Sequence, residues 1–199
     1  MSETGLPLYL VSPEGGACEV LPALQGAAGR HRTAPERQGG EMIMAFDPGS
    51  VTGAYGVLDS DGNFVTCGDL PTTPFGGSGK IQVNSALLGK LVDEIKPDLA
   101  VVEWVNVMPK QGASSGFAFG VSFGIILGVL GGARIPYLLV TPGKWKKAMG
   151  LSKDKDSSRT LALRRWPNAG DYLALKKHHG RAESLLLAEY QRCRNILAS

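Results

Sequence analysis

The chain has 199 residues, 43% of them hydrophobic, and a formal net charge of +3. This length allows one domain with a sizeable core and is short for two, so we expect a single domain. Its 3 cysteines show no CxxC spacing, which argues against a disulfide framework or a zinc site and favours a reducing compartment. The apolar run from Phe117 to Leu130 is about 14 residues long, below the roughly 20 that span a bilayer, so we expect a soluble protein without a membrane partner.

The small net charge hides an asymmetry along the chain. Residues 1–133 hold 7 Lys and Arg against 13 Asp and Glu, whereas residues 134–199 hold 14 against 5. Because a solvated surface normally mixes the two signs, this cationic C-terminal third favours a polyanion such as a nucleic acid as partner.

The first 41 residues differ in composition from the rest. They are rich in Gly, Ala, Pro and Glu and show no sustained period of 2 or 3.6 residues. This pattern predicts a flexible N-terminal tail over 1–41 that carries no catalytic residue. A targeting segment, a propeptide and an added leader are all open as its origin. The domain is expected to span 42–199.

The domain is predicted to begin with an antiparallel meander. Its strands are expected at 42–47, 53–58 and 63–68. An Asp-Gly turn at 61–62 joins the second strand to the third. After a loop rich in Gly, Thr and Pro, apolar residues at helical spacing predict a helix over 80–95, which Lys96 and Pro97 end.

Strands and helices alternate in the second part. A strand is predicted at 99–102 with Glu103 at its end, followed by a loop over 106–114 and an apolar, glycine-rich helix to about residue 132. The remaining predicted elements are a strand at 136–140 and helical segments at 141–149, 156–165 and 180–195. This order predicts an α/β protein with a ribonuclease H-like fold, in which helices flank a mixed five-stranded sheet.

Three acidic residues are candidates for a metal site. Asp47 and Glu103 each end an apolar strand, and if those strands are parallel neighbours, both carboxylates emerge at one sheet edge, where open α/β sheets bind ligands. Taken alone, each acid is as typical of a capping or surface residue as of a metal ligand. A buried carboxylate, however, is costly unless it is paired or binds a cation. Glu183 precedes an apolar run on the last helix and is the expected third ligand. His179 lies four residues earlier on the same helical face and is a candidate to touch the site, whereas Glu189 is expected to face solvent.

Several blocks of this sequence resemble those of RuvC-type Holliday-junction resolvases. The segment FDPGSVTGAYGVL resembles the first motif of that family, and AVVEWV resembles its second acidic strand. Four further blocks resemble, in order, those of the phage-like and chloroplast (monokaryotic chloroplast) branch: MPKQGASSGFAFG, VTPGKWKK, KDKDSSRTLALRRWP and KKHHGRAESLLLAEY. The resemblance covers about 43–191. Cellular members usually have Asp where this chain has Glu183, and their acid or histidine three residues earlier is Gly180 here.

The resemblance implies a homodimeric, structure-selective endonuclease that resolves four-way (Holliday) DNA junctions. It implies two Mg²⁺ ions in each site, with Mn²⁺ as substitute, held by Asp47, Glu103 and Glu183 for two-metal hydrolysis of phosphodiester bonds. It also implies that Lys155 lies near the scissile phosphate, where a cation would offset developing charge. His179 is the expected substitute for the fourth ligand that Gly180 cannot supply.

The resemblance further implies how DNA is bound. Met108 is the candidate wedge at the crossover, while Trp145 and Trp166 are expected to be core residues rather than stacking platforms. The expected DNA contacts are Lys110, Gln111, Ser114, Ser115, Lys144, Lys146, Lys147, Lys153, Arg159, Arg164, Arg165, Lys176, Lys177 and Arg181.

Two other functions are compatible with parts of this pattern. One is a non-catalytic module of the same fold that binds branched DNA. The other is an actin-like phosphotransferase, whose phosphate loop also contains Asp-x-Gly before a hairpin, but about 150 residues leave no room for its second domain. The GRAE block favours the chloroplast nucleoid as location, with the bacterial cytoplasm or a phage-infected cell as alternatives.

Overall fold

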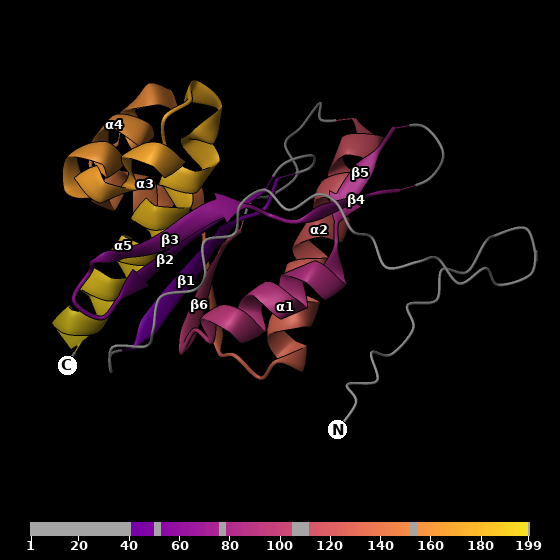
Figure 1. Ribbon diagram of the computed structural model, residues 1–199, viewed down its shortest axis with the longest axis horizontal. Coiled ribbons are helices and arrows are strands. Elements are labelled where there is room, and N and C mark those ends of the chain that lie inside the picture. The colour runs from indigo at the N-terminus through magenta and orange to yellow at the C-terminus, as the bar shows by residue number, and fades with distance from the viewer. Residues whose placement is uncertain (1–40, 50–52, 76–78, 105–111, 152–154, 199) are drawn as a thin grey trace, which may run out of the picture. The chain divides into compact units, whose positions relative to one another are not determined.

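A mixed five-stranded sheet lies at the centre of the fold in the computed structural model of the chain (Figure 1). The structure describes residues 41–49, 53–75, 79–104, 112–151 and 155–198. In the spatial order β3-β2-β1-β6-β7, the strands are Phe64–Asp69, Ala54–Asp59, Met42–Asp47, Leu99–Glu103 and Tyr137–Val140. The first three along the chain are antiparallel neighbours, whereas β6 runs parallel to β1 and β7 parallel to β6. The expected mixed sheet is therefore confirmed.

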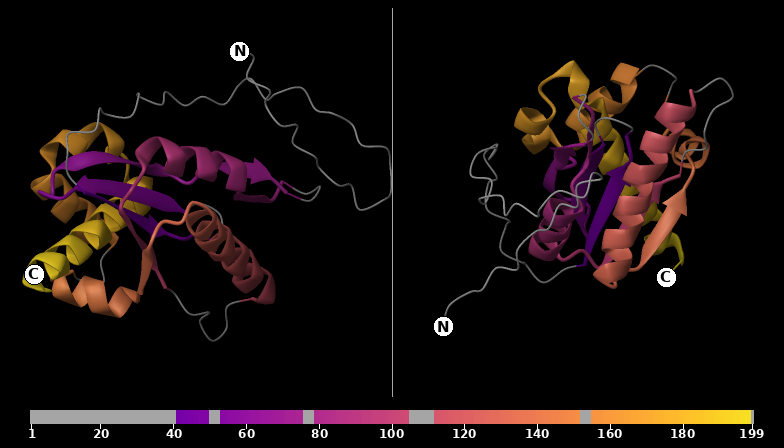
Figure 2. Two further views of the ribbon diagram at one scale, coloured as in Figure 1. Left: turned by 90° about the horizontal axis from the view of Figure 1, so that it is seen from below. Right: turned by 90° about the vertical axis from the view of Figure 1, so that its right-hand side faces the viewer.

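Helices cover both faces of this sheet (Figure 2). One face carries α1 (Ser85–Ile95) and α2 (Ala113–Gly132). The other carries α3 (Pro142–Ala148), α4 (Lys155–Arg165) and α5 (His179–Ala198), with short 3-10 turns at Pro167–Tyr172 and Lys176–His178. Successive β1 side chains point to opposite faces, so Met44 and Phe46 pack with α1 and α2, while Ile43 and Ala45 pack with α5.

The close packing of α5 on the sheet depends on a glycine in β2. A Cβ atom at Gly56 would lie 2.6 Å from the backbone nitrogen of Leu185, so only glycine permits this approach. Leu185, Leu186 and Leu187 are at most 1% exposed. This packing holds the first turns of α5, which include Glu183, over β1 and β2.

A second, two-stranded sheet was not predicted from the sequence. In it, β4 (Thr72–Pro74) pairs antiparallel with β5 (Ile81–Val83). The helix predicted over 80–95 therefore begins only at Ser85. Asn84 determines this start, because its side chain accepts a hydrogen bond of 3.0 Å from the Leu87 N–H.

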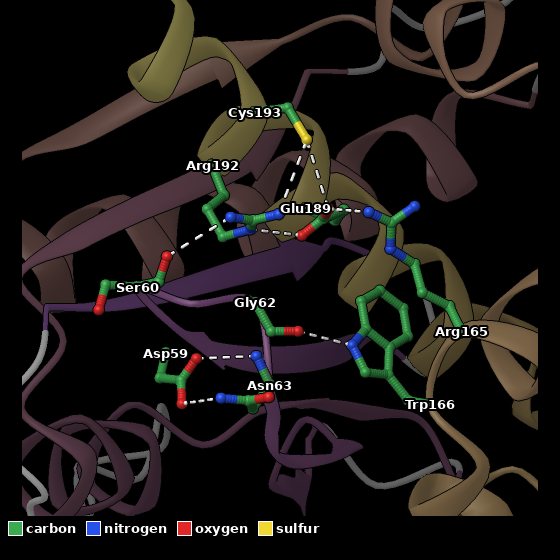
Figure 3. A network of polar contacts seen from close by, with 9 residues as sticks. All are labelled: Asp59, Ser60, Gly62, Asn63, Arg165, Trp166, Glu189, Arg192 and Cys193. Atoms are coloured by element: carbon green, nitrogen blue, oxygen red, sulfur yellow. Dashed lines mark hydrogen bonds and ion pairs between the residues drawn. The ribbon is translucent and has the colours of Figure 1, made fainter. Parts of the chain in front are cut away.

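Glu189 is buried, so the expectation that it faces solvent is wrong. It is 1% exposed and accepts hydrogen bonds from Arg165 of α4 and from Arg192 and the Cys193 thiol of α5 (Figure 3). Arg192 also donates to the Ser60 carbonyl in the β2–β3 turn at 3.5 Å. Because α4 packs across α5 on this side, the carboxylate is shielded from water and needs these partners.

Both tryptophans that were expected in the core are buried. Trp145 is 0% exposed and Trp166 is 4% exposed. The Trp166 Nε1–H donates to the Gly62 carbonyl at 2.8 Å, which links the residue after α4 to the β2–β3 turn (Figure 3).

The apolar helix α2 is longer than expected and largely uncovered. It has 20 residues, its most apolar window has a mean hydropathy of 1.8, and 17% of that window is buried. Among the described residues, this helix is long and apolar enough to cross a membrane, by length and composition alone. The expectation that its apolar run is too short to span a bilayer therefore does not hold. Ser122, Ile126 and Leu130 form its buried row. Gly120, Gly124, Gly128 and Gly132 form an exposed row on the opposite side.

Candidate active site

Two of the three candidate carboxylates end neighbouring strands. In the parallel β1–β6 pair, Phe46 is opposite Val102. The next residue of each strand, Asp47 in β1 and Glu103 in β6, therefore lies at the same sheet edge. The alternation along both strands directs these two side chains to the face covered by α5. Glu103 is buried at 5% exposure.

The electrostatics of this pair show that the carboxylates crowd one another. The pKa of Asp47 is raised well above its ordinary value by burial, then by the negative charges of Glu103 and Glu183, and Lys146 offsets part of this effect. Burial also raises the pKa of Glu103, although hydrogen bonds from Trp145 and Asp47 and the charge of Lys146 oppose the rise.

Glu183 completes the cluster from α5. Its Oε1 accepts hydrogen bonds from Lys146 Nζ at 2.9 Å and from the Ser158 hydroxyl at 3.2 Å. The Glu183 side chain is 13% exposed and that of Lys146 is 34% exposed. The three carboxylates thus come from three elements that are far apart in the sequence.

The position three residues before Glu183 lies directly against Asp47. A Cβ atom at Gly180 would be 3.1 Å from Asp47 Oδ2, so the missing side chain lets α5 lie close to this carboxylate. His179 is half-exposed. Among the contacts of the described residues, none joins His179 to the three carboxylates, so its expected role as a further ligand stays a prediction.

The donor set fits a divalent cation by its chemistry. Carboxylate oxygens are the ligands that Mg²⁺ and Mn²⁺ prefer, and a cation would relieve the repulsion that raises the pKa of Asp47. Within the part of the chain that the structure describes, no three or more His, Cys, Asp or Glu side chains lie close enough together to hold a metal ion as they stand. Instead, the Lys146 ammonium contacts Glu183 and supplies positive charge to the cluster.

Several expected DNA contacts are instead committed to the protein. Arg181 forms a bidentate pair with Asp69, at 2.7 Å for both bonds, and donates to the Tyr172 carbonyl at 3.0 Å. Arg159 donates to the Leu173 carbonyl at 3.1 Å, and its Nε is buried. Lys146 and Arg165 are likewise paired, with Glu183 and Glu189 of α5, although both side chains remain partly exposed. Helix packing brings acids and carbonyls within reach of these four residues.

The other expected contacts fall into two groups. Exposed positions are held by Ser114, Ser115, Lys144, Lys147, Arg164, Lys176 and Lys177. Outside the described residues lie Met108, Lys110, Gln111 and Lys153. Lys155 is the first residue of α4, but the structure does not describe its side chain.

Sequence reasoning did not predict three contacts with the cluster. Trp145, expected in the core, donates from Nε1 to Glu103 Oε1 at 2.8 Å. Lys146, expected to contact DNA, and Ser158, which was not singled out, both donate to Glu183. The only local signal was the WKK triplet, in which an indole and two ammonium groups follow a predicted strand; nothing local indicated which acid each would meet.

A central sheet of this order, with acids ending β1 and β6 and a third acid on the helix across them, defines the ribonuclease H-like class. The fold is similar to that of Thermus thermophilus RuvC in complex with a Holliday junction substrate, with a TM-score of 0.55 and 17% identity over 78% of this chain and 96% of that one. A second structure of Thermus thermophilus RuvC gives a TM-score of 0.50 and 15% identity over 79% and 96%.

The sequence comparison is more specific than the fold. The chain is 31% identical over 112 residues to the crossover junction endodeoxyribonuclease RuvC of Alkalilimnicola ehrlichii, which is 54% of this chain and 66% of that protein, slightly less than two thirds. No protein-family model matches the chain. The chain is thus similar to RuvC proteins both in part of its sequence and in its fold.

Proposed function

We propose that this chain is a divalent-metal-dependent endonuclease that resolves four-way DNA junctions. The observation that carries this proposal is that Asp47 and Glu103 end neighbouring strands at one sheet edge, where burial and the nearby charge of Glu183 on α5 raise both pKa values. Clustered acids with perturbed pKa values are typical of functional sites. The similarity to a crossover junction endodeoxyribonuclease supports the substrate class.

Asp47, Glu103 and Glu183 are the proposed ligands of two Mg²⁺ ions, with Mn²⁺ as substitute. When bound, such ions would activate a water molecule and stabilise the leaving 3′ oxygen of a phosphodiester. Lys146 contributes a positive charge beside Glu183, where a phosphate would approach the carboxylates. Lys155 and His179 remain proposed members of the site.

The exposed cations near the site are the proposed DNA contacts. Lys144 and Lys147 lie on α3, and Lys176 and Lys177 precede α5. Each phosphate that they neutralise releases counterions, so binding should weaken steeply as salt increases.

Junction cleavage with carboxylate variants tests the function. Asp47→Asn, Glu103→Gln and Glu183→Gln should each abolish cutting of a four-way junction and leave electrophoretic binding of that junction largely intact, because each removes a metal ligand and no phosphate contact. Y-shaped and linear DNA serve as substrate controls, with product ends mapped to the nucleotide. If the unsubstituted protein binds junctions but cuts none with Mg²⁺ or Mn²⁺, the non-catalytic module is the correct function.

We also propose that the exposed side of α2 is covered by a second copy of this chain. The helix is apolar yet largely unburied, and its glycine row would let two such helices approach closely. A two-fold symmetric dimer matches the two-fold symmetry of a four-way junction.

Gly124→Leu tests this interface. No atom lies within 4 Å of a Cβ placed at Gly124, so the single chain accommodates the side chain, but close packing of two helices does not. Gly89→Leu on α1 is the matched control, since nothing lies within 4 Å there either. Sedimentation should show dimers for the unsubstituted protein and Gly89→Leu, and monomers for Gly124→Leu. A Gly124→Leu dimer would contradict the proposal, and binding of the unsubstituted protein to lipid vesicles would instead identify a membrane contact.

A further inference from the structure

Two consecutive residues of α3 contact two different carboxylates of the candidate site. Trp145 donates from Nε1 to Glu103 Oε1 at 2.8 Å, and Lys146 donates from Nζ to Glu183 Oε1 at 2.9 Å. The Trp145 bond is buried, because its indole is 0% exposed and Glu103 is 5% exposed. The Lys146 ammonium, in contrast, retains contact with solvent.

The two donors differ in what they do to a carboxylate. An ammonium group neutralises the charge of its partner and competes with any cation that binds there. An indole N–H is a neutral, donor-only group, so it holds one carboxylate oxygen in place and leaves the negative charge available. Trp145 is therefore suited to orient a ligand without weakening it.

The position of the indole is determined by the rigid part of the fold. Glu103 is opposite Val140 in the β6–β7 pair, and α3 begins two residues after Val140. Trp145 then packs in the same buried cluster as Val140 and Leu186. Because the ring is enclosed on all sides, its N–H direction cannot follow a movement of the carboxylate and instead restrains it.

We propose that Trp145 is a positioning residue that fixes Glu103 for binding a divalent cation. This role rests on the proposed metal-dependent function. Loss of the indole N–H should weaken cation binding even when the ring volume is retained, because the buried carboxylate would lose its fixed orientation. Hydrogen-bond partners of metal ligands typically account for about 10- to 100-fold in affinity.

The chain offers a matched control for this role. Trp166 is also buried, at 4% exposure, and its Nε1–H also makes one hydrogen bond of 2.8 Å, but the acceptor is the Gly62 carbonyl in the β2–β3 turn (Figure 3). Trp145→Phe and Trp166→Phe thus remove the same group from two buried rings. Only the first substitution leaves a carboxylate of the site without its donor.

Calorimetric titration of the full-length chain with MgCl₂ and with MnCl₂ measures the effect. We expect Trp145→Phe to bind each ion about 10-fold or more weakly than the unsubstituted protein, and Trp166→Phe to bind within about twofold of it. Thermal unfolding of both variants shows whether they remain folded. Equal ion affinity for the two variants would overturn the proposal.

A measurement on the unsubstituted protein does not depend on how Trp145→Phe folds. The chain has 3 tryptophans, so its NMR spectrum should contain three indole N–H signals, and Trp104→Phe and Trp166→Phe assign the third to Trp145. Addition of Mg²⁺ should shift the Trp145 signal and leave that of Trp166 in place. If the protein binds the ion but the Trp145 signal does not move, the positioning role is wrong and the proposed function stands. If the protein binds neither ion, the proposed metal-dependent function is wrong as well.

Discussion

The Lys146 side chain contacts a carboxylate of the candidate site, although its neighbouring cations in the sequence indicated a DNA contact. It lies among exposed cations and was expected to contact DNA phosphates, but its ammonium is 2.9 Å from Glu183 and 5.2 Å from the centre of the Trp145 ring. It also lowers the pKa values of Asp47 and Glu103 through its charge. Its neighbour Lys147 is exposed, so two adjacent lysines have different surroundings.

Substitution of these two lysines separates their roles. Lys146→Met should lower the single-turnover cleavage rate by about 10²-fold or more, because the site loses its positive charge, while junction affinity changes little. Lys147→Met should leave that rate unchanged at saturating protein and reduce the slope of log affinity against log salt by about 0.9. The measurements are quenched single-turnover cleavage and electrophoretic binding over a salt series. If the two variants show the same defect, Lys146 is an ordinary phosphate contact.

The helices α4 and α5 are joined to the β2–β3 turn by the network around Glu189. Burial alone would raise the pKa of Glu189, but hydrogen bonds from Arg192 and Cys193 and the charge of Arg165 outweigh that effect, and the pKa lies below its ordinary value of 4.5. Since α4 supplies Ser158 and α5 supplies Glu183, this network holds together the two helices that meet at the candidate site.

Glu189→Gln should lower the free energy of unfolding at pH 7 by about 2–4 kcal/mol, because two arginines lose the charge that they enclose. A pKa lowered by folding means that the carboxylate stabilises the protein above pH 4.5 and ceases to do so as the pH falls through its folded pKa. The stability difference between the variant and the unsubstituted protein should therefore narrow at acidic pH, as measured by urea unfolding.

Glu94→Gln is the control for this measurement. Glu94 forms an exposed pair with Lys90 at 3.8 Å, and such pairs contribute about 1 kcal/mol or less. An equal effect of both substitutions would show that the Glu189 network contributes no more than a surface pair.

For the chain as a whole, the N-terminal boundary of the domain can be tested by truncation. A chain that begins at Met42 should retain its melting temperature and its cleavage activity, because residues 1–41 lack the apolar periodicity needed to join a core. The Met42 nitrogen, which donates to Asp98 Oδ2 at 2.8 Å, would become an amino group that still donates there. The measurement is thermal unfolding beside junction cleavage.

A chain that begins at Ala45 is the contrasting case. It lacks Ile43 and Met44, which are 4% and 0% exposed in the two halves of the core, and it should not fold. A melting temperature that falls by more than a few degrees on removal of 1–41 alone would move the domain boundary toward the N-terminus.

The sequence by itself predicted the five strands of the central sheet in chain order and the acids that end β1 and β6. Apolar runs that end at Asp47 and Glu103 are local patterns, and the period of 2 or 3.6 residues distinguishes strand from helix without knowledge of distant contacts. The same local reasoning failed at residues 81–83, where pairing with β4 and the Asn84 cap selected a strand over the expected helix.

Only the tertiary structure decided which polar groups meet. The bond from Trp145 to Glu103 joins residues 42 positions apart, that from Lys146 to Glu183 joins residues 37 apart, and that from Arg181 to Asp69 joins residues 112 apart. The burial of Glu189 likewise follows from the packing of α4 across α5. Such partners depend on how helices pack on the sheet, which is a sum of many long-range contacts, and therefore no local pattern around any one of these residues predicts them.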